Sequence, residues 1–281
     1  MSLSLVNSRR LADWEAACKL YDSVVQNLSV LKKESLYARD HWLIFTLPQI
    51  LKSRKPAHLT RSEVIDIVVW KHVKGKWRPN QRLVERNSDK AVAEVSERAF
   101  AVLASKKAGK ATFFEALKII TELGGVGPAT GTALLSCFDA SVPFMSDEAL
   151  KAMNGSGAKL EYNLVEADAL YSKCNQIALA LTAAQTKNAP HSLASSSSSS
   201  SSSAASSSSS SVLASSLDSL PWTAPKVQLC LYADYHAQTL KGVSSAPSTA
   251  PPSKGATNAA LKKTEVTTEG TVSGRKRRKI A

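Results

Sequence analysis

The chain has 281 residues, 43% of them hydrophobic, and its 36 Lys and Arg against 23 Asp and Glu give a formal net charge of +13. This composition supports a globular core and favours a polyanionic partner such as nucleic acid. The four cysteines and five histidines lack the spacing of a zinc site or a disulfide framework. The N-terminus lacks the layout of a signal peptide, and no apolar run is long enough to cross a membrane. We therefore expect an intracellular monomer without a cofactor, a metal ion or a membrane partner.

Apolar residues at helical spacing predict helices over most of the chain. Residues 60–63, Thr-Arg-Ser-Glu, form a capping box, and Ser88 is a second expected N-cap. A further capping box, from Thr112 to Glu115, is expected to open the helix that ends at Leu123. The other helices are expected at about 11–34, 38–52 with a bend or an end near Pro48, 128–137, 146–153, 160–186 and 222–240.

Few segments show the period-two alternation that is typical of strands, so we expect an all-α domain. Two serine runs, at 195–203 and 206–211, bury nothing and are expected to be disordered. The helix after them is too apolar to stand alone. We expect it to pack back on the domain, which makes residues 194–216 an inserted low-complexity loop. The domain then covers residues 1–242, and a disordered tail covers 243–281.

The tail ends in a dense basic cluster that consists of Arg275, Lys276, Arg277, Arg278 and Lys279. Such a cluster after a segment rich in Pro, Ser, Thr and Ala predicts a nuclear localisation signal. It implies a nuclear import receptor as a partner and the nucleus as the location. The alternative interpretation, a basic arm that grips nucleic acid nonspecifically, is compatible with the first.

The most informative segment runs from Leu123 to Gly131, with the sequence Leu-Gly-Gly-Val-Gly-Pro-Ala-Thr-Gly. It predicts a tight turn between two helices, the second of which Pro128 opens. Gly125 and Gly127 have no side chains that would keep a phosphate from their amides, and the second helix adds free N–H groups and its positive dipole end. A purely structural glycine turn is the alternative. The expected nucleic-acid contacts of this turn are Gly125, Val126, Gly127, Ala129 and Thr130.

A second notable segment, residues 70–79, combines four basic side chains with two tryptophans. Lysine and arginine can neutralise phosphates, and an indole ring can stack on an unpaired base. We expect Lys74, Lys76, Trp77 and Arg78 to form a rim that faces DNA. The alternative is a core tryptophan followed by a solvated basic loop.

The glycine turn and the later Ser146-Asp147 pair resemble the hairpin and the catalytic aspartate of the helix-hairpin-helix DNA glycosylase superfamily, which includes endonuclease III. Gly124 stands where proline is usual, Ala129 falls at the lysine position, and Asp147 lies 18 residues further on, at the aspartate position. The resemblance implies an all-helical glycosylase-like domain with DNA as its partner and Asp147 as its catalytic residue. Since Ala129 cannot form a Schiff base, no lyase activity is expected. Ala149 stands where members of this superfamily often have a histidine. The cluster-binding cysteines of endonuclease III are absent.

As a catalytic residue, Asp147 would stabilise an oxocarbenium-like sugar or activate the attacking water, once the base has been flipped out of the duplex. Ser146, Asp147 and Glu148 are also what a helix N-terminus favours, namely a capping serine and acids at the positive dipole end. Asp139 and Glu148 are the nearby substitutes if Asp147 is not the catalytic acid.

Three functions remain open from the sequence. The first is a nuclear, monofunctional DNA N-glycosylase that removes a damaged or mispaired base. The second is a noncatalytic helix-hairpin-helix module that binds DNA or RNA through its backbone. The third is a nuclear adaptor whose helical domain contacts protein.

Overall fold

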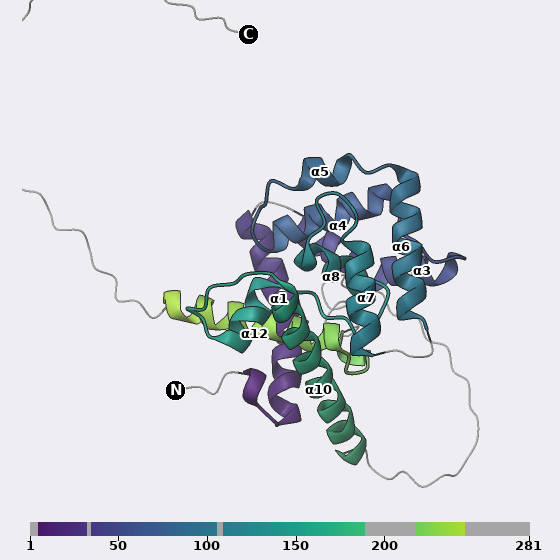
Figure 1. Ribbon diagram of the computed structural model, residues 1–281. Coiled ribbons are helices and arrows are strands. Elements are labelled where there is room, and N and C mark those ends of the chain that lie inside the picture. Colours follow the sequence, from purple (N-terminus) through teal and green to yellow (C-terminus); the bar gives the residue numbers. More distant parts are fainter. Residues whose placement is uncertain (1–4, 33–34, 106–108, 189–216, 245–281) are drawn as a thin grey trace, which may run out of the picture. The chain divides into compact units, whose positions relative to one another are not determined.

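The computed structural model describes residues 5–32, 35–105, 109–188 and 217–244, and within these residues the chain forms helices and no strand (Figure 1). The all-α class is therefore confirmed for this part of the chain. The helices are η1 (Leu5–Asn7), α1 (Leu11–Lys32), α2 (Leu36–His41), the π-helical turn η2 (Trp42–Thr46), α3 (Leu47–Ser53), α4 (Arg61–Lys74), α5 (Gln81–Glu85), α6 (Asp89–Leu103), α7 (Lys110–Ile120), α8 (Pro128–Ser136), α9 (Asp147–Asn154), α10 (Leu164–Asn188) and α12 (Ala224–Ser244).

The helix starts in the first half follow local capping chemistry. Thr60 begins α4 with the expected capping box, in which its hydroxyl accepts the Glu63 amide and the Glu63 carboxylate accepts the Thr60 amide. Ser88 caps α6 by accepting the amide of Ala91. Pro48 does not end the helical run, which continues from α2 through the π-helical turn η2 into α3, with Pro48 in the first turn of α3.

The capping box expected from Thr112 to Glu115 is wrong. α7 begins earlier, with Gly109 as its N-cap and Thr112 already in the third helical position. From there the Thr112 hydroxyl accepts the Gly109 amide at 2.9 Å and donates to the Gly109 carbonyl at 2.7 Å. The threonine therefore closes the first turn from inside the helix rather than capping it from outside.

The core joins helices that are far apart in the sequence. Trp14 and Tyr21 of α1, Trp70 of α4 and Tyr232 of α12 are all fully buried, at 2% exposure or less. α12 packs against α1, α9 and α10, and the amide of Ala224 at its start donates to the carbonyl of Ala140. The helix after the serine-rich segment thus completes the same core, which holds the helices around the candidate site (Figure 1).

Two predicted segments lie outside the described residues. They are the serine-rich insert at 194–216 and the tail, including the basic cluster at 275–279, although α12 itself continues to Ser244. None of the helices that the structure describes has both the length and the apolar character that a membrane span requires.

Candidate nucleic-acid interface

The turn between α7 and α8 needs a glycine at position 125. Gly125 has a φ of +79°, in the left-handed region that favours glycine. A Cβ atom at this position would lie 2.9 Å from the Asn80 carbonyl oxygen, from Cβ of Leu83 and from the amide nitrogen of Val84. Both the backbone conformation and the tight contact with α5 therefore explain this glycine without a ligand.

Two asparagine side chains, Asn80 and Asn87, hold the turn in place. The Asn80 amide donates to the Gly125 carbonyl at 2.8 Å, and its oxygen lies 2.9 Å from Nε2 of His72. The Asn87 amide donates to the Gly124 carbonyl at 3.0 Å and its oxygen accepts the Gly124 amide at 2.8 Å. These bonds fix the backbone of the hairpin before any ligand arrives.

Gly127 is different, because the fold does not explain it. Its φ of −91° suits any residue, and a Cβ atom there would meet nothing within 4 Å. Open space beside the backbone is what the close approach of a phosphate requires. The first amide of α8 to be bonded is that of Gly131, which donates to the Gly127 carbonyl.

The amides at the start of α8 are free to bind an anion. Within the described parts of the chain, no group accepts a hydrogen bond from the amides of Gly127, Ala129 or Thr130. These N–H groups and the helix dipole form an anion-binding end on a nine-residue helix. Val126 does not belong to this set, since its amide donates to the Leu123 carbonyl and its side chain is buried. The expected contact of Val126 with nucleic acid is therefore wrong.

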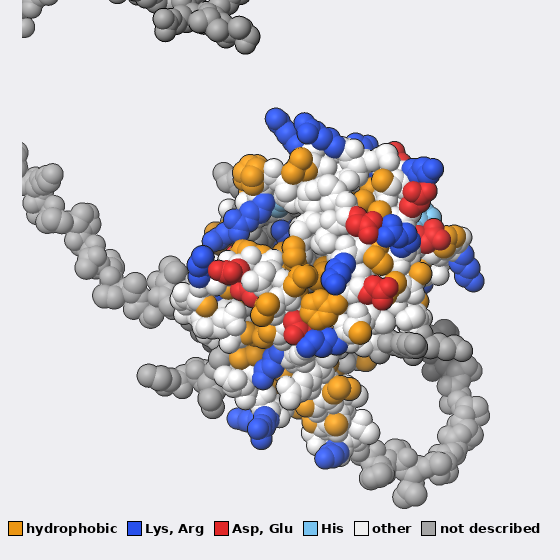
Figure 2. All heavy atoms as spheres, in the orientation of Figure 1, with side chains coloured by type: hydrophobic (Ala, Val, Ile, Leu, Met, Phe, Trp, Pro, Cys, Tyr) orange, Lys and Arg blue, Asp and Glu red, His pale blue; other side chains and the backbone are white. Residues whose placement is uncertain are grey.

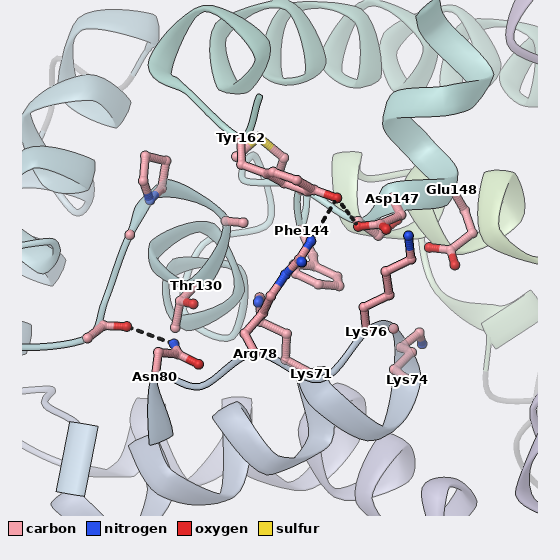
Figure 3. Close-up of a pocket in the computed structure, with 17 residues that line it drawn as sticks. Lys71, Lys74, Lys76, Arg78, Asn80, Thr130, Phe144, Asp147, Glu148 and Tyr162 are labelled. Carbon is pink, nitrogen blue, oxygen red and sulfur yellow. Dashed lines mark hydrogen bonds between the residues drawn. The ribbon is translucent and has the colours of Figure 1, made fainter. Parts of the chain in front are cut away.

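Asp147 lines the same cavity as the hairpin. Ser146 caps α9 by accepting the amide of Ala149, so the capping interpretation of this segment is also correct. The Asp147 carboxylate is nevertheless among the groups around a cavity of about 300 Å³. That cavity is shown in Figure 3, and its wall on the hairpin side consists of Gly125, Gly127, Pro128, Ala129 and Thr130.

Tyr162 and Arg78 complete the surroundings of this carboxylate. The Tyr162 hydroxyl donates to Oδ1 of Asp147 at 2.8 Å, and the Arg78 guanidinium lies over the tyrosine ring, 5.4 Å from its centre (Figure 3). Burial first, and then the Asp147 carboxylate, raise the pKa of Tyr162 to about 12, so the phenol remains a hydrogen-bond donor at neutral pH. The sequence analysis placed Tyr162 inside a helix, whereas α10 begins only at Leu164.

The basic segment after α4 provides an exposed rim beside the cavity. Lys76 and Arg78 are exposed and line the cavity, and Trp77 between them is 68% exposed. Arg82 on α5 and Arg86 after it are also exposed, and Figure 2 shows Lys and Arg side chains gathered over α5. Phosphate groups along a bound strand would meet positive charge on this side of the hairpin.

Lys74 does not belong to that rim, which corrects the expectation from the sequence. Its side chain is only 1% exposed, and its ammonium lies 2.7 Å from Oδ1 of the fully buried Asp40. The rings of Tyr21, Trp70 and Tyr232 surround it at 4.8, 5.1 and 4.5 Å from their centres. The charge of Lys74 therefore compensates a buried carboxylate in the core beneath the cavity.

The two alternative catalytic acids, Glu148 and Asp139, differ in whether they line the cavity. Glu148 lines the cavity, is 7% exposed and lies 3.3 Å from Nε2 of His236. Burial is the largest effect and raises the pKa of Glu148, but the hydrogen bond from His236, a backbone hydrogen bond and the charges of His236 and Lys74 together hold that pKa below its ordinary value. Asp139 lies outside the cavity lining and accepts the amide of Ser141 in the loop after α8.

Lys71 is a further charged group at the cavity. It lies one turn before Lys74 on α4 and is only partly buried. Burial, followed by the nearby Arg78, lowers the pKa of Lys71 against the opposing effect of Asp147. The sequence placed Lys71 in the basic segment but did not distinguish it from its neighbours.

Among the residues that the structure describes, no three His, Cys, Asp or Glu side chains lie together in a way that would hold a metal ion. Comparison of the chain with protein-family models, with curated proteins and with solved structures gives no match.

Proposed function

We propose that this protein binds DNA through the hairpin and the basic rim, and that it hydrolyses the N-glycosidic bond of one flipped-out nucleotide. The observation that carries the proposal is that Asp147 lines the same cavity of about 300 Å³ as Gly127 and the free amides of α8. A phosphate held at those amides would bring its own nucleotide to the carboxylate. A phosphate contact alone positions the strand, whereas the acid beside it supplies the chemistry.

Two features of the cavity support base release. The flipped base would enter between the hairpin and the segment that leads to α9, next to the aromatic ring of Phe144. Oδ1 of Asp147 is held by Tyr162, which leaves Oδ2 to face the sugar. A fixed carboxylate stabilises the positive charge that develops on the sugar as the C–N bond breaks, and it can take a proton from the attacking water.

The basic cluster at 275–279 favours activity in the nucleus and an import receptor as a partner. We propose that the protein acts on DNA as a monomer. We include no lyase step at the hairpin, because Ala129 stands at the lysine position. The test is a screen of duplexes that each contain one damaged or mispaired base, with release of the free base as the readout.

A noncatalytic module that binds DNA or RNA is the second candidate, because Ala129 removes an amine from the hairpin and Asp147 also serves the start of α9. The salt dependence of binding distinguishes an adaptor that contacts protein from the two candidates that bind nucleic acid. Phosphate contacts make the affinity fall linearly with salt on a log–log plot, whereas an apolar protein interface responds weakly. A bound duplex that releases no base, with affinity lost at high salt, would favour the noncatalytic module.

A further inference from the structure

Two lysines on α4 that are one turn apart have opposite environments. The Lys74 ammonium is paired with Asp40 and enclosed by three aromatic rings. Lys71 lines the cavity, and no residue in the described part of the chain forms an ion pair or a hydrogen bond with its ammonium. A partly buried charge that forms no ion pair or hydrogen bond is unfavourable, so the fold alone does not explain a lysine at position 71.

Figure 3 shows how Lys71 lies relative to the proposed catalytic acid. Lys71 comes from α4, on one side of the cavity, and Asp147 and Tyr162 lie on the other side, which the Arg78 side chain reaches from the loop after α4. The space between the two sides is where the flipped base would be held. A nucleotide held between the two sides would meet Lys71 on one side and Asp147 on the other.

The surroundings of Lys71 lower its pKa and so favour loss of its proton. Desolvation is the largest effect, the positive Arg78 adds to it, and Asp147 opposes both. The other titratable groups that line the cavity or lie beside Lys71 are His72 and Lys74 on α4, Lys76 in the following loop, Glu148 on α9 and Tyr162 before α10. An ammonium that gives up its proton more readily than an ordinary lysine is suited to general acid catalysis near neutral pH.

We propose that Lys71 is the general acid that protonates the base as it leaves, an assignment that rests on the proposed function. The bond from C1′ to the base nitrogen breaks, and its electron pair goes to the base. The Lys71 ammonium transfers a proton to the base, water adds to C1′, and Asp147 takes the proton that this water loses. Asp147 then releases its proton to solvent and Lys71 regains one from solvent, so the net reaction is hydrolysis of the glycosidic bond.

The test compares Lys71→Gln with the wild type on two substrates of the active class, one whose base leaves only when protonated and one whose base is stable as an anion. On the first substrate, Lys71→Gln should lose about 10²- to 10⁴-fold in rate. On the second, the loss should be at least about tenfold smaller. The alkaline limb of the kcat/KM profile should also disappear. Lys90→Gln, an exposed lysine on α6, is the control and should behave as the wild type on both substrates.

A measurement on the free wild-type protein keeps the assignment testable if Lys71→Gln does not fold. In an NMR titration of the lysine side chains, the pKa of the Lys71 amine should lie below the ordinary lysine value of 10.5. A Lys71 pKa at or above that value would overturn the assignment.

Three further outcomes decide whether the role of Lys71, the proposed function or both must be given up. If Asp147→Asn is inactive but Lys71→Gln keeps the wild-type pH profile on both substrates, the role of Lys71 falls and the proposed function stands. If borohydride traps Lys71 covalently on a strand with an abasic site, Lys71 is a nucleophile, and its assignment as a general acid is overturned. If the wild type releases no base from any duplex, both proposals fall together.

Discussion

The hydroxyl of Tyr162 donates a 2.8 Å hydrogen bond to Oδ1 of Asp147 from a residue whose φ is +54°. For a residue with a Cβ atom this left-handed conformation costs on the order of 1 kcal/mol or more, and such strain concentrates at functional sites. The Glu166 carboxylate accepts the amides of Glu161 and Tyr162 and so stabilises the strained turn. The chain thus keeps an unfavourable backbone angle at the position where a phenol holds the proposed catalytic carboxylate.

The coupling between Tyr162 and Asp147 is measurable without a substrate. In the wild type the Tyr162 phenol should ionise with a pKa of about 12, above the ordinary value of 10.0. Asp147→Asn should lower that pKa, because it removes a negative charge next to the phenolate. A spectroscopic titration of the tyrosines, with Tyr162→Phe to assign the signal, measures the shift. Identical tyrosine titrations in the wild type and Asp147→Asn would contradict the coupling.

The same shift predicts how stability depends on pH. The folded pKa of Tyr162 is above the unfolded value, so its contribution is complete below pH 10 and is lost as the pH rises through about 12. The free energy of unfolding should fall over this interval, and Tyr162→Phe should make the fall less steep. Urea unfolding at a series of pH values tests this, and an equally steep fall in Tyr162→Phe would count against it.

Gly125 and Gly127 should respond in opposite ways to substitution. Gly127→Glu adds a side chain in open space, so the free energy of unfolding should change by less than about 0.5 kcal/mol. The added negative charge at the α8 N-terminus should weaken DNA binding by at least about tenfold, or 1.4 kcal/mol. Gly125→Ala should instead destabilise the fold by about 2 kcal/mol or more, because of its φ and three contacts at 2.9 Å. Thermal unfolding and binding titrations of both variants separate the two roles, and equal DNA affinity of Gly127→Glu and the wild type would exclude a phosphate contact there.

Lys74 and Lys76 form a second matched pair. Lys74→Ala leaves Asp40 buried without its counterion and should destabilise the protein by about 3–5 kcal/mol. Lys76→Ala should leave the free energy of unfolding unchanged and should reduce the slope of log affinity against log salt by about 1. Denaturant unfolding and binding at several salt concentrations measure both effects. A stable Lys74→Ala variant with a reduced salt slope would restore Lys74 to the DNA-facing rim.

Local chemistry made much of the fold predictable. The capping box at Thr60, the cap at Ser88, the proline at the start of α8 and the cap at Ser146 each depend on residues within one helical turn. Thr112 shows the limit of such reasoning. Its hydroxyl can bond to the backbone as a cap or from inside the first turn, and the pattern of residues 112–115 does not distinguish the two.

The candidate site was predictable only where its residues are close in the sequence. The Gly127 turn and the spacing to Asp147 identified the two sides of the cavity. Asn80 and Tyr162 act across 45 and 15 residues, through contacts that no local pattern encodes. Lys74 was misassigned because a run of basic residues shows charge but not exposure. The packing of α4 buries the Lys74 side chain against Asp40 at the base of the cavity, whereas Lys71 is only partly buried there.

The role of Asp147 is tested by two measurements on Asp147→Asn with the same duplex, namely single-turnover base release and DNA affinity, with Asp139→Asn as the control. We expect Asp147→Asn to lose base release while its affinity stays at the wild-type value, and Asp139→Asn to retain both. Full base release by Asp147→Asn would contradict the central claim that this carboxylate acts on the nucleotide held by the hairpin.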